Sequence, residues 1–164
     1  MGGSTTDQSI IRHWNCVEAA VGEAFLGTCG VQVAPIDGGK QFISDCGKVI
    51  VAVINLVGDV DWAVFLGLPK ETAEELSTMF TGFEIPYDSE DMGDAVGELT
   101  NILAGTLKAV LDRKGVAADI SLPTVMRGQH MEFLAQSNIQ SRQQLYDSPH
   151  GKFVTGVTIG SIIG

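Results

Sequence analysis

Three polar residues, Asp94, Glu98 and Asn101, follow one another at intervals of four and three positions. In an α-helix this spacing stacks their side chains on one face, so the carboxylate of Glu98 and the amide of Asn101 can reach one partner group together. An amide accepts and donates hydrogen bonds and stays neutral, whereas a carboxylate accepts them and carries charge. The set could therefore bind and orient a polar group. The plain alternative is a solvated polar face, which surface helices commonly carry.

Two glycines, Gly97 and Gly105, accompany these polar residues. Glycine inside a helix costs about 1 kcal/mol relative to alanine. Two of them in one helix predict that something approaches the helix backbone closely, although glycines that simply pack against a sheet are the alternative.

The helix that must position these side chains is predicted over residues 88–115. Asp88 and Ser89 offer caps, and Gly115 stands where a left-handed residue would end the helix. An apolar stripe with helical spacing runs roughly opposite the polar face; it comprises Met92, Val96, Leu99, Leu103, Leu107 and Val110.

Residues 95–105 resemble the signature helix of the CheC/CheX/FliY family of chemotaxis phosphatases. That signature places an Asp or Ser four positions before a Glu, an Asn three positions after it, and a Pro after about 21 more residues. Asp94, Glu98 and Asn101 fit it, and Pro123 follows after 21 intervening residues. Glu-x-x-Asn alone is weak evidence, but the upstream Asp and the fixed-distance Pro make a chance match much rarer.

The resemblance implies a phosphatase that acts on the aspartyl phosphate of a CheY-like response regulator. The regulator would supply Mg²⁺, and the phosphatase would need no cofactor of its own. Asn101 would hold a water in line with phosphorus, because phosphoryl transfer depends mostly on positioning and electrostatics. Glu98 would pair with the regulator's active-site Lys. Asp94, Gly97 and Gly105 would support the site or contact the partner, and Pro123 would fix the entry of the next strand.

A second site of this kind is absent from the N-terminal helix, where Glu18 is followed three positions later by Val21. Family members that resemble a tandem carry two Glu-x-x-Asn motifs, so this departure favours a CheX-like member with one site per chain. Members of that type pair edge strands, which leads us to expect a homodimer.

The other elements predict an α+β fold, with long helices packed on a largely antiparallel sheet. Thr5 and Gln8 look like the start of a first helix that ends near Gly27, followed by a short strand and a turn in residues 32–45. Residues 48–57 and 60–68 read as a hairpin with a type II′ turn at Gly58 and Asp59.

The remaining segments are a short helix and further strands. The helix begins at Pro69, ends at Gly82 and has an apolar face of Leu76, Met79 and Phe80. Residues 119–126 and 152–159 are predicted strands, and residues 129–151 have no clear assignment.

The length of 164 residues predicts one domain over residues 5–160, with residues 1–4 a flexible N-terminus or an expression remnant. Twenty acidic against ten basic residues give a net charge of −10, which disfavours binding to nucleic acid or anionic lipid. No apolar run is long enough for membrane insertion, and no signal peptide is apparent. We therefore expect a cytoplasmic protein whose cysteines, Cys16, Cys29 and Cys46, are reduced thiols.

Three functions compete. The first is phosphatase activity; the second is a non-catalytic module of the same fold that docks a regulator or a flagellar-switch component. The third is an acidic interaction domain with an accidental motif. Exposed side chains of Glu98 and Asn101 favour the enzyme, whereas burial of both favours a scaffold. The histidines, His13, His130 and His150, lack metal-binding spacing and are not assigned a role.

Overall fold

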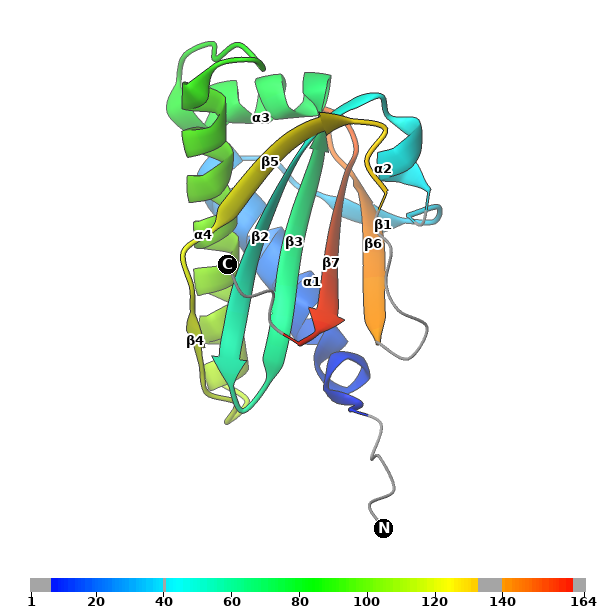
Figure 1. Cartoon of the computed structure of the whole chain (residues 1–164). Coiled ribbons are helices and arrows are strands. Elements are labelled where there is room, and N and C mark those ends of the chain that lie inside the picture. Colours follow the sequence, from blue (N-terminus) through cyan, green and yellow to red (C-terminus); the bar gives the residue numbers. More distant parts are fainter. Residues whose placement is uncertain (1–6, 40, 133–139, 161–164) are drawn as a thin grey trace.

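The computed structural model describes residues 7–39, 41–132 and 140–160 (Figure 1). The helices are α1 (Ser9–Cys29), α2 (Phe42–Asp45), α3 (Lys70–Thr81) and α4 (Glu90–Asp112). The strands are β1 (Ala34–Ile36), β2 (Lys48–Gly58), β3 (Asp61–Pro69), β4 (Ala118–Ile120), β5 (Thr124–Gln129), β6 (Ser141–Asp147) and β7 (Phe153–Ile159). The expectations for residues 1–4 and Thr5 lie outside the described residues.

All seven strands form one sheet in the order β1-β6-β7-β3-β2-β4, with β5 also paired to β2, and every pair is antiparallel. The outer edge of β2 is shared by two strands: β5 pairs with residues 48–53 and β4 with residues 56–58. The chain leaves the sheet between them, over residues 121–123. The predicted α+β fold is confirmed.

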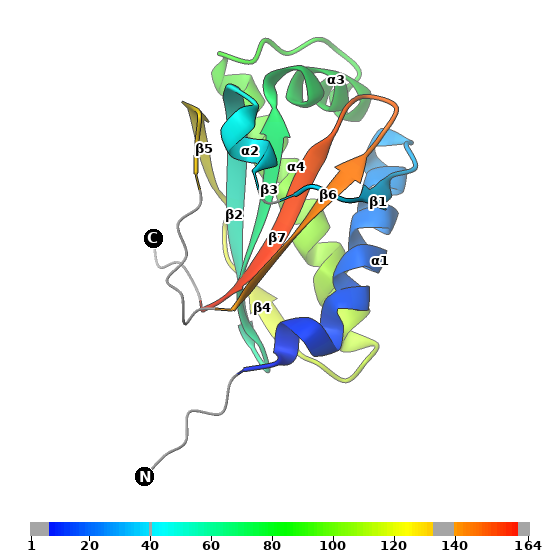
Figure 2. The ribbon, with the colours of Figure 1, turned by 90° about the vertical axis from the view of Figure 1, so that its right-hand side faces the viewer.

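The long helices cover one face of the sheet. α1 and α4 pack against each other on that face, and α3 lies across one end of the pair (Figures 1 and 2). Alternate residues of β2, such as Ile50 and Ile54, join the helix-side core, while Val49 and Val51 join a smaller cluster with Ile43 of α2 on the other face. Among the described residues, no helix has the length and hydropathy to span a membrane.

Helix α4 matches its prediction closely. Ser89 caps it, and its Oγ accepts a hydrogen bond from the backbone N–H of Met92 at 3.3 Å. Gly115 follows with a φ of 80°, in the left-handed region. The whole predicted apolar stripe is buried, from Met92 to Val110. This burial fixes the rotation of α4 and turns its polar residues outward.

Helix α1 departs from its predicted ends. Gln8 precedes the first helical residue and its side chain makes no capping bond, so it does not occupy the third helical position. The helix continues past Gly27 to Cys29, because Gly30, with a φ of 67°, supplies the left-handed C-cap. The burial of Cys29, which is 2% exposed, accompanies this extra half-turn.

The predicted type II′ turn between β2 and β3 is wrong. The last paired positions are Val57 and Asp61, with three residues between them, and the φ of Gly58 is not positive. A Cβ at Gly58 would lie 2.5 Å from the carbonyl oxygen of Ala117, so glycine is needed here for close approach of the chain entering β4. Asp59 strengthens the same contact, because its carboxylate accepts a hydrogen bond from the backbone N–H of Ala117 at 2.9 Å.

Other differences concern short elements. The predicted strand over residues 119–126 is split into β4 and β5, with Pro123 in the break, and the unassigned stretch contains β6. The one-turn helix α2 was not predicted. In α3, Pro69 is the N-cap and not the first helical residue, and Met79 is 46% exposed and so does not belong to the apolar face.

Candidate functional site

The outer face of α4 borders an open hollow of about 400 Å³. Asp94 and Glu98 are exposed there and Asn101 is partly exposed, so the predicted geometry of one accessible helix face is confirmed. The opposite wall of the hollow is formed by Leu122, Pro123 and Val125, which belong to the crossover from β4 to β5 and to β5 itself.

Five of the six predicted site residues meet in this hollow: Asp94, Gly97, Glu98, Asn101 and Pro123. Gly105, two helical turns beyond Glu98, is not among the residues that line it. Pro123 lies 22 positions from Asn101 in sequence, yet the folding of β5 onto β2 returns it to the same helix face.

The close approach predicted at the two glycines occurs at only one of them. A Cβ on Gly97 would lie 3.4 Å from Cγ2 of Val125 and 3.7 Å from Cγ of Pro123, so the crossover packs directly against the helix there. At Gly105, apart from the helix's own nearby backbone, no described atom lies within 4 Å of such a Cβ, so the approach of a partner to this glycine stays a prediction. The missing side chain instead leaves the helix surface open beyond Asn101.

The N-terminal end of α4 is fastened to the sheet by groups that sequence reasoning missed. Nη1 of Arg127, on β5, donates to the carbonyl oxygen of Tyr87 at 2.8 Å and also to that of Ser89. The hydroxyl of Tyr87 donates to the carbonyl oxygen of Val49 at 2.7 Å, and burial raises the pKa of this phenol. No local pattern in the sequence pairs Arg127 with these carbonyls, because 38 to 40 residues separate them.

The crossover itself is held by two hydrogen bonds to β2. The N–H of Ser121 donates to the carbonyl oxygen of Asn55, and the N–H of Asn55 donates to Oγ of Ser121, both at 3.0 Å. The next residue, Leu122, is 88% exposed. Sequence reasoning overlooked it; the available signal was an apolar residue directly before a proline that interrupts strand pairing.

The side chains of Glu98 and Asn101 have no hydrogen-bond or ion-pair partner in the described part of the chain, so both are available to an external group. The exposed carboxylates of Asp94 and Glu98 suit a cationic group on that partner. No cluster of His, Cys, Asp or Glu in residues 7–39, 41–132 and 140–160 could hold a metal ion. What this face offers is an acceptor pair and a neutral amide.

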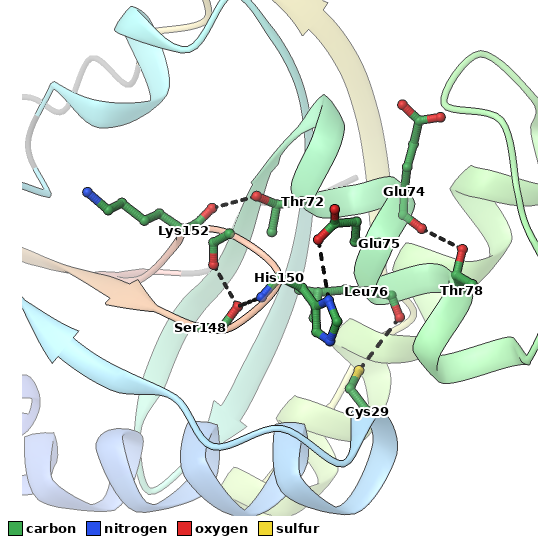
Figure 3. A network of polar contacts seen from close by, with 10 residues as sticks. Cys29, Thr72, Glu74, Glu75, Leu76, Thr78, Ser148, His150 and Lys152 are labelled. Atoms are coloured by element: carbon green, nitrogen blue, oxygen red, sulfur yellow. Dashed lines mark hydrogen bonds and ion pairs between the residues drawn. The ribbon is translucent and has the colours of Figure 1, made fainter.

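A larger groove of about 600 Å³ lies elsewhere, along α3 and the loop after it. Figure 3 shows the contacts at its side: Nδ1 of His150 pairs with the carboxylate of Glu75 at 3.3 Å, and Oγ1 of Thr72 donates to the carbonyl oxygen of Lys152 at 3.0 Å. These contacts fasten the β6–β7 turn to α3. None of the predicted site residues lines this groove.

Comparison with known proteins agrees with the signature helix. The family model described as "Chemotaxis phosphatase CheX" matches residues 50–146, more than half of the chain. A curated protein of Thermotoga maritima, "CheY-P phosphatase CheX", is 33% identical over 84 residues, which are 51% of this chain and 54% of that protein. The match thus spans about half the length of this relative.

Solved structures of the same fold cover almost the whole chain. A CheC-like superfamily protein from Shewanella sp. PV-4 superposes with a TM-score of 0.78 at 19% identity, covering 92% of this chain and 99% of that one. CheX from Vibrio vulnificus gives 0.73 at 18% identity, covering 87% and 93%. CheX from Borrelia burgdorferi, solved as a CheX-CheY-BeF3-Mg²⁺ complex, gives 0.67 at 19% identity, covering 90% and 96%. With its family model, its fold and its signature helix in agreement, this chain belongs to the CheX family of chemotaxis phosphatases.

Proposed function

We propose that this chain hydrolyses the aspartyl phosphate of a CheY-like response regulator. The observation that carries the proposal is the presentation of Glu98 and Asn101 side by side on the exposed face of α4, at the edge of an open hollow and without a hydrogen-bond or ion-pair partner among the described residues. The family match and the Thermotoga relative named CheY-P phosphatase support it. We place the reaction in the cytoplasm, where receiver proteins of this kind act.

The reaction requires a water oxygen to bond to phosphorus while the bond from phosphorus to the aspartyl oxygen breaks, which yields inorganic phosphate and a free carboxylate. Asn101 contributes by accepting a hydrogen bond from the attacking water and holding it in line. Its neutrality matters, because a second carboxylate there would repel the phosphoryl group. Positioning of this kind is a large part of catalysis of phosphoryl transfer.

Glu98 orients the complex through an ion pair with the regulator's active-site Lys. It lies one helical turn before Asn101, so both side chains can enter one partner pocket. We assign the Mg²⁺ to the regulator, and the Borrelia CheX structure, a CheX-CheY-BeF3-Mg²⁺ complex, supports the presence of this ion in the assembled pair. Asp94 flanks the pair as a further contact to the partner. Gly97 and Pro123 let the crossover pack directly against the helix and form one wall of the hollow. Gly105, which has no side chain, leaves room for the regulator to approach the helix.

A homodimer is the second part of the proposal. Among the described strands, β5 pairs with β2 alone, so its other edge has no strand on it and can pair with another copy. Sedimentation analysis over a range of concentrations tests this part, and a monomer at all concentrations contradicts it.

The alternative function is a binding module of the same fold that docks a regulator without hydrolysis. The accessibility of both Glu98 and Asn101 favours the enzyme, since a module that keeps the pair only as scaffold has no need to leave both side chains free.

The test is a timed loss of phosphate from a phosphorylated CheY-like regulator after removal of the phosphodonor. Catalytic amounts of the chain should accelerate the loss over many turnovers, with Mg²⁺ present for the regulator. Asn101→Ala is the inactive comparison, and Asn15→Ala, an exposed amide on α1, is the matched control. If the two proteins bind but the chain does not change the rate of phosphate loss, the binding module is the correct function.

A further inference from the structure

Leu122 is more exposed than any other large apolar side chain in the described residues, at 88%, against 66% for Ile11 and 65% for Phe83. A single exposed leucine is ordinary on a protein surface, so exposure alone carries no conclusion. Its position is what distinguishes it. Leu122 lines the same hollow as Glu98 and Asn101, on the wall opposite the helix.

The backbone that carries Leu122 is fixed on both sides. Ser121 makes two hydrogen bonds with Asn55 of β2, and Pro123 packs over Gly97 of α4. A side chain on a fixed backbone loses less conformational freedom on binding than one on a loose loop. The crossover therefore presents an apolar group in a defined place, on the same hollow as the polar pair.

We propose that Leu122 is a docking anchor that contacts an apolar patch beside the phosphorylated carboxylate of the response regulator. This inference rests on the proposed function, since it names how the regulator seats on the same site. A partner that delivers a group to Asn101 must cover the hollow, and the wall formed by Leu122 is then buried with it. An apolar contact at that edge excludes water from the ion pair of Glu98 and strengthens it.

The test compares Leu122→Ser with Leu26→Ser, which removes an exposed leucine of α1 that lies outside the hollow. Affinity is measured for a CheY-like regulator activated with beryllofluoride and Mg²⁺. Loss of a buried leucine contact should weaken binding about 10- to 100-fold for Leu122→Ser. Leu26→Ser should bind like the wild type, and Leu122→Met should recover most of the affinity.

Turnover separates this role from those of the polar pair. Leu122→Ser should raise half-saturation by the same factor and leave the rate at saturation within about twofold, because the contact is present in the ground-state complex. Equal affinity of Leu122→Ser and the wild type, with hydrolysis intact, overturns the anchor and leaves the proposed function standing. A wild type that neither binds nor dephosphorylates the regulator overturns both.

A second copy of the chain is the rival occupant of this wall. Sedimentation of the same variants decides between the two: the anchor predicts an unchanged oligomeric state for Leu122→Ser. A loss of dimer in that variant, with unchanged affinity for the regulator, assigns Leu122 to self-association and overturns the proposal.

Discussion

The two long helices, α1 and α4, are similar in length and lie side by side on one face of the sheet (Figure 2). Each carries a glutamate in the corresponding stretch, but their surroundings differ. On α1, the carboxylate of Glu18 accepts a hydrogen bond from Nε1 of Trp14 at 3.1 Å, and Val21, three positions later, is fully buried. On α4, Glu98 is exposed and Asn101 reaches the surface.

The comparison shows that a carboxylate on a helix becomes a candidate site only under two conditions. The carboxylate must not accept a hydrogen bond from a side chain one helical turn away. The residue three positions after it must face the partner and not the core. Glu18 meets neither condition, because Trp14 lies one turn before it and Val21 belongs to the main core. Helix α4 therefore provides the candidate site, while α1 contributes to the core.

Truncating the inner face of α4 should have the largest effect on stability. Leu103 is 2% exposed and lies in the middle of the apolar stripe, so Leu103→Ala should lower the free energy of unfolding by roughly 2–5 kcal/mol. Urea denaturation measures it. Leu26→Ala, at an exposed position of α1, should change it by less than about 0.5 kcal/mol, and similar losses in both variants would show that this face of α4 is not core.

Copying the motif onto α1 should destabilise the protein without creating a site. Val21→Asn completes a Glu-x-x-Asn sequence there but puts an amide into the core, at a cost of about 2 kcal/mol or more. Ala19→Asn, at an exposed position of the same helix, is the control and should cost only its helix propensity, about 0.7 kcal/mol. Phosphatase activity of Val21→Asn in an Asn101→Ala background contradicts the comparison.

Loosening the start of α4 should cost less. Arg127→Met removes the bonds to the carbonyl oxygens of Tyr87 and Ser89 and keeps the aliphatic stem, for a loss of about 1–2 kcal/mol. Hydrogen exchange should accelerate at the first amides of α4 before the rest of the helix. Arg12→Met, an exposed arginine of α1, is the control, and unchanged exchange at the start of α4 refutes the fastening role.

The smallest effect is expected for the internal bond of α1. Glu18→Ala leaves Nε1 of Trp14 without its acceptor and should lower the free energy of unfolding by about 1 kcal/mol, with phosphatase activity intact. The indole remains packed, with the guanidinium of Arg142 at 4.4 Å from its ring. If this variant lost phosphatase activity without losing stability, Glu18 would belong to a functional site, and the proposed difference between Glu18 and Glu98 would be wrong.

The parts of the molecule that could be predicted from sequence depend on local signals. Ser89, Gly115 and the apolar stripe fix the ends and the rotation of α4, and with them the outward direction of Glu98 and Asn101. The strands β2 and β3 are so rich in Val, Ile and Phe that both could be predicted directly from the sequence. The turn between them was predicted wrongly because a distant contact, Gly58 against Ala117, overrides the local turn preference.

The second wall of the site depends on contacts between distant residues. The family resemblance predicted Pro123 as the residue that fixes the entry of the next strand, but its position beside the helix could not be predicted, since no local pattern indicates that β5 returns to β2. Arg127 owes its contacts to that return and could not be assigned before the fold was known, whereas for Leu122 the sequence offered only the signal of an apolar residue directly before a proline. The role of Gly105 stays a prediction, because helix composition does not reveal what lies opposite a glycine and the described residues place nothing there.

Saturation curves with phosphorylated regulator, recorded for Asn101→Ala and Glu98→Ala, test the central claim most directly. Asn101→Ala should lower the rate at saturation by about 100-fold or more, because the water loses its positioning, with little change in half-saturation. Glu98→Ala should instead raise half-saturation by roughly 30-fold or more, since a truncated interfacial ion pair costs about 2–5 kcal/mol. Near wild-type turnover in Asn101→Ala would contradict the assignment of Asn101 and put the binding module first.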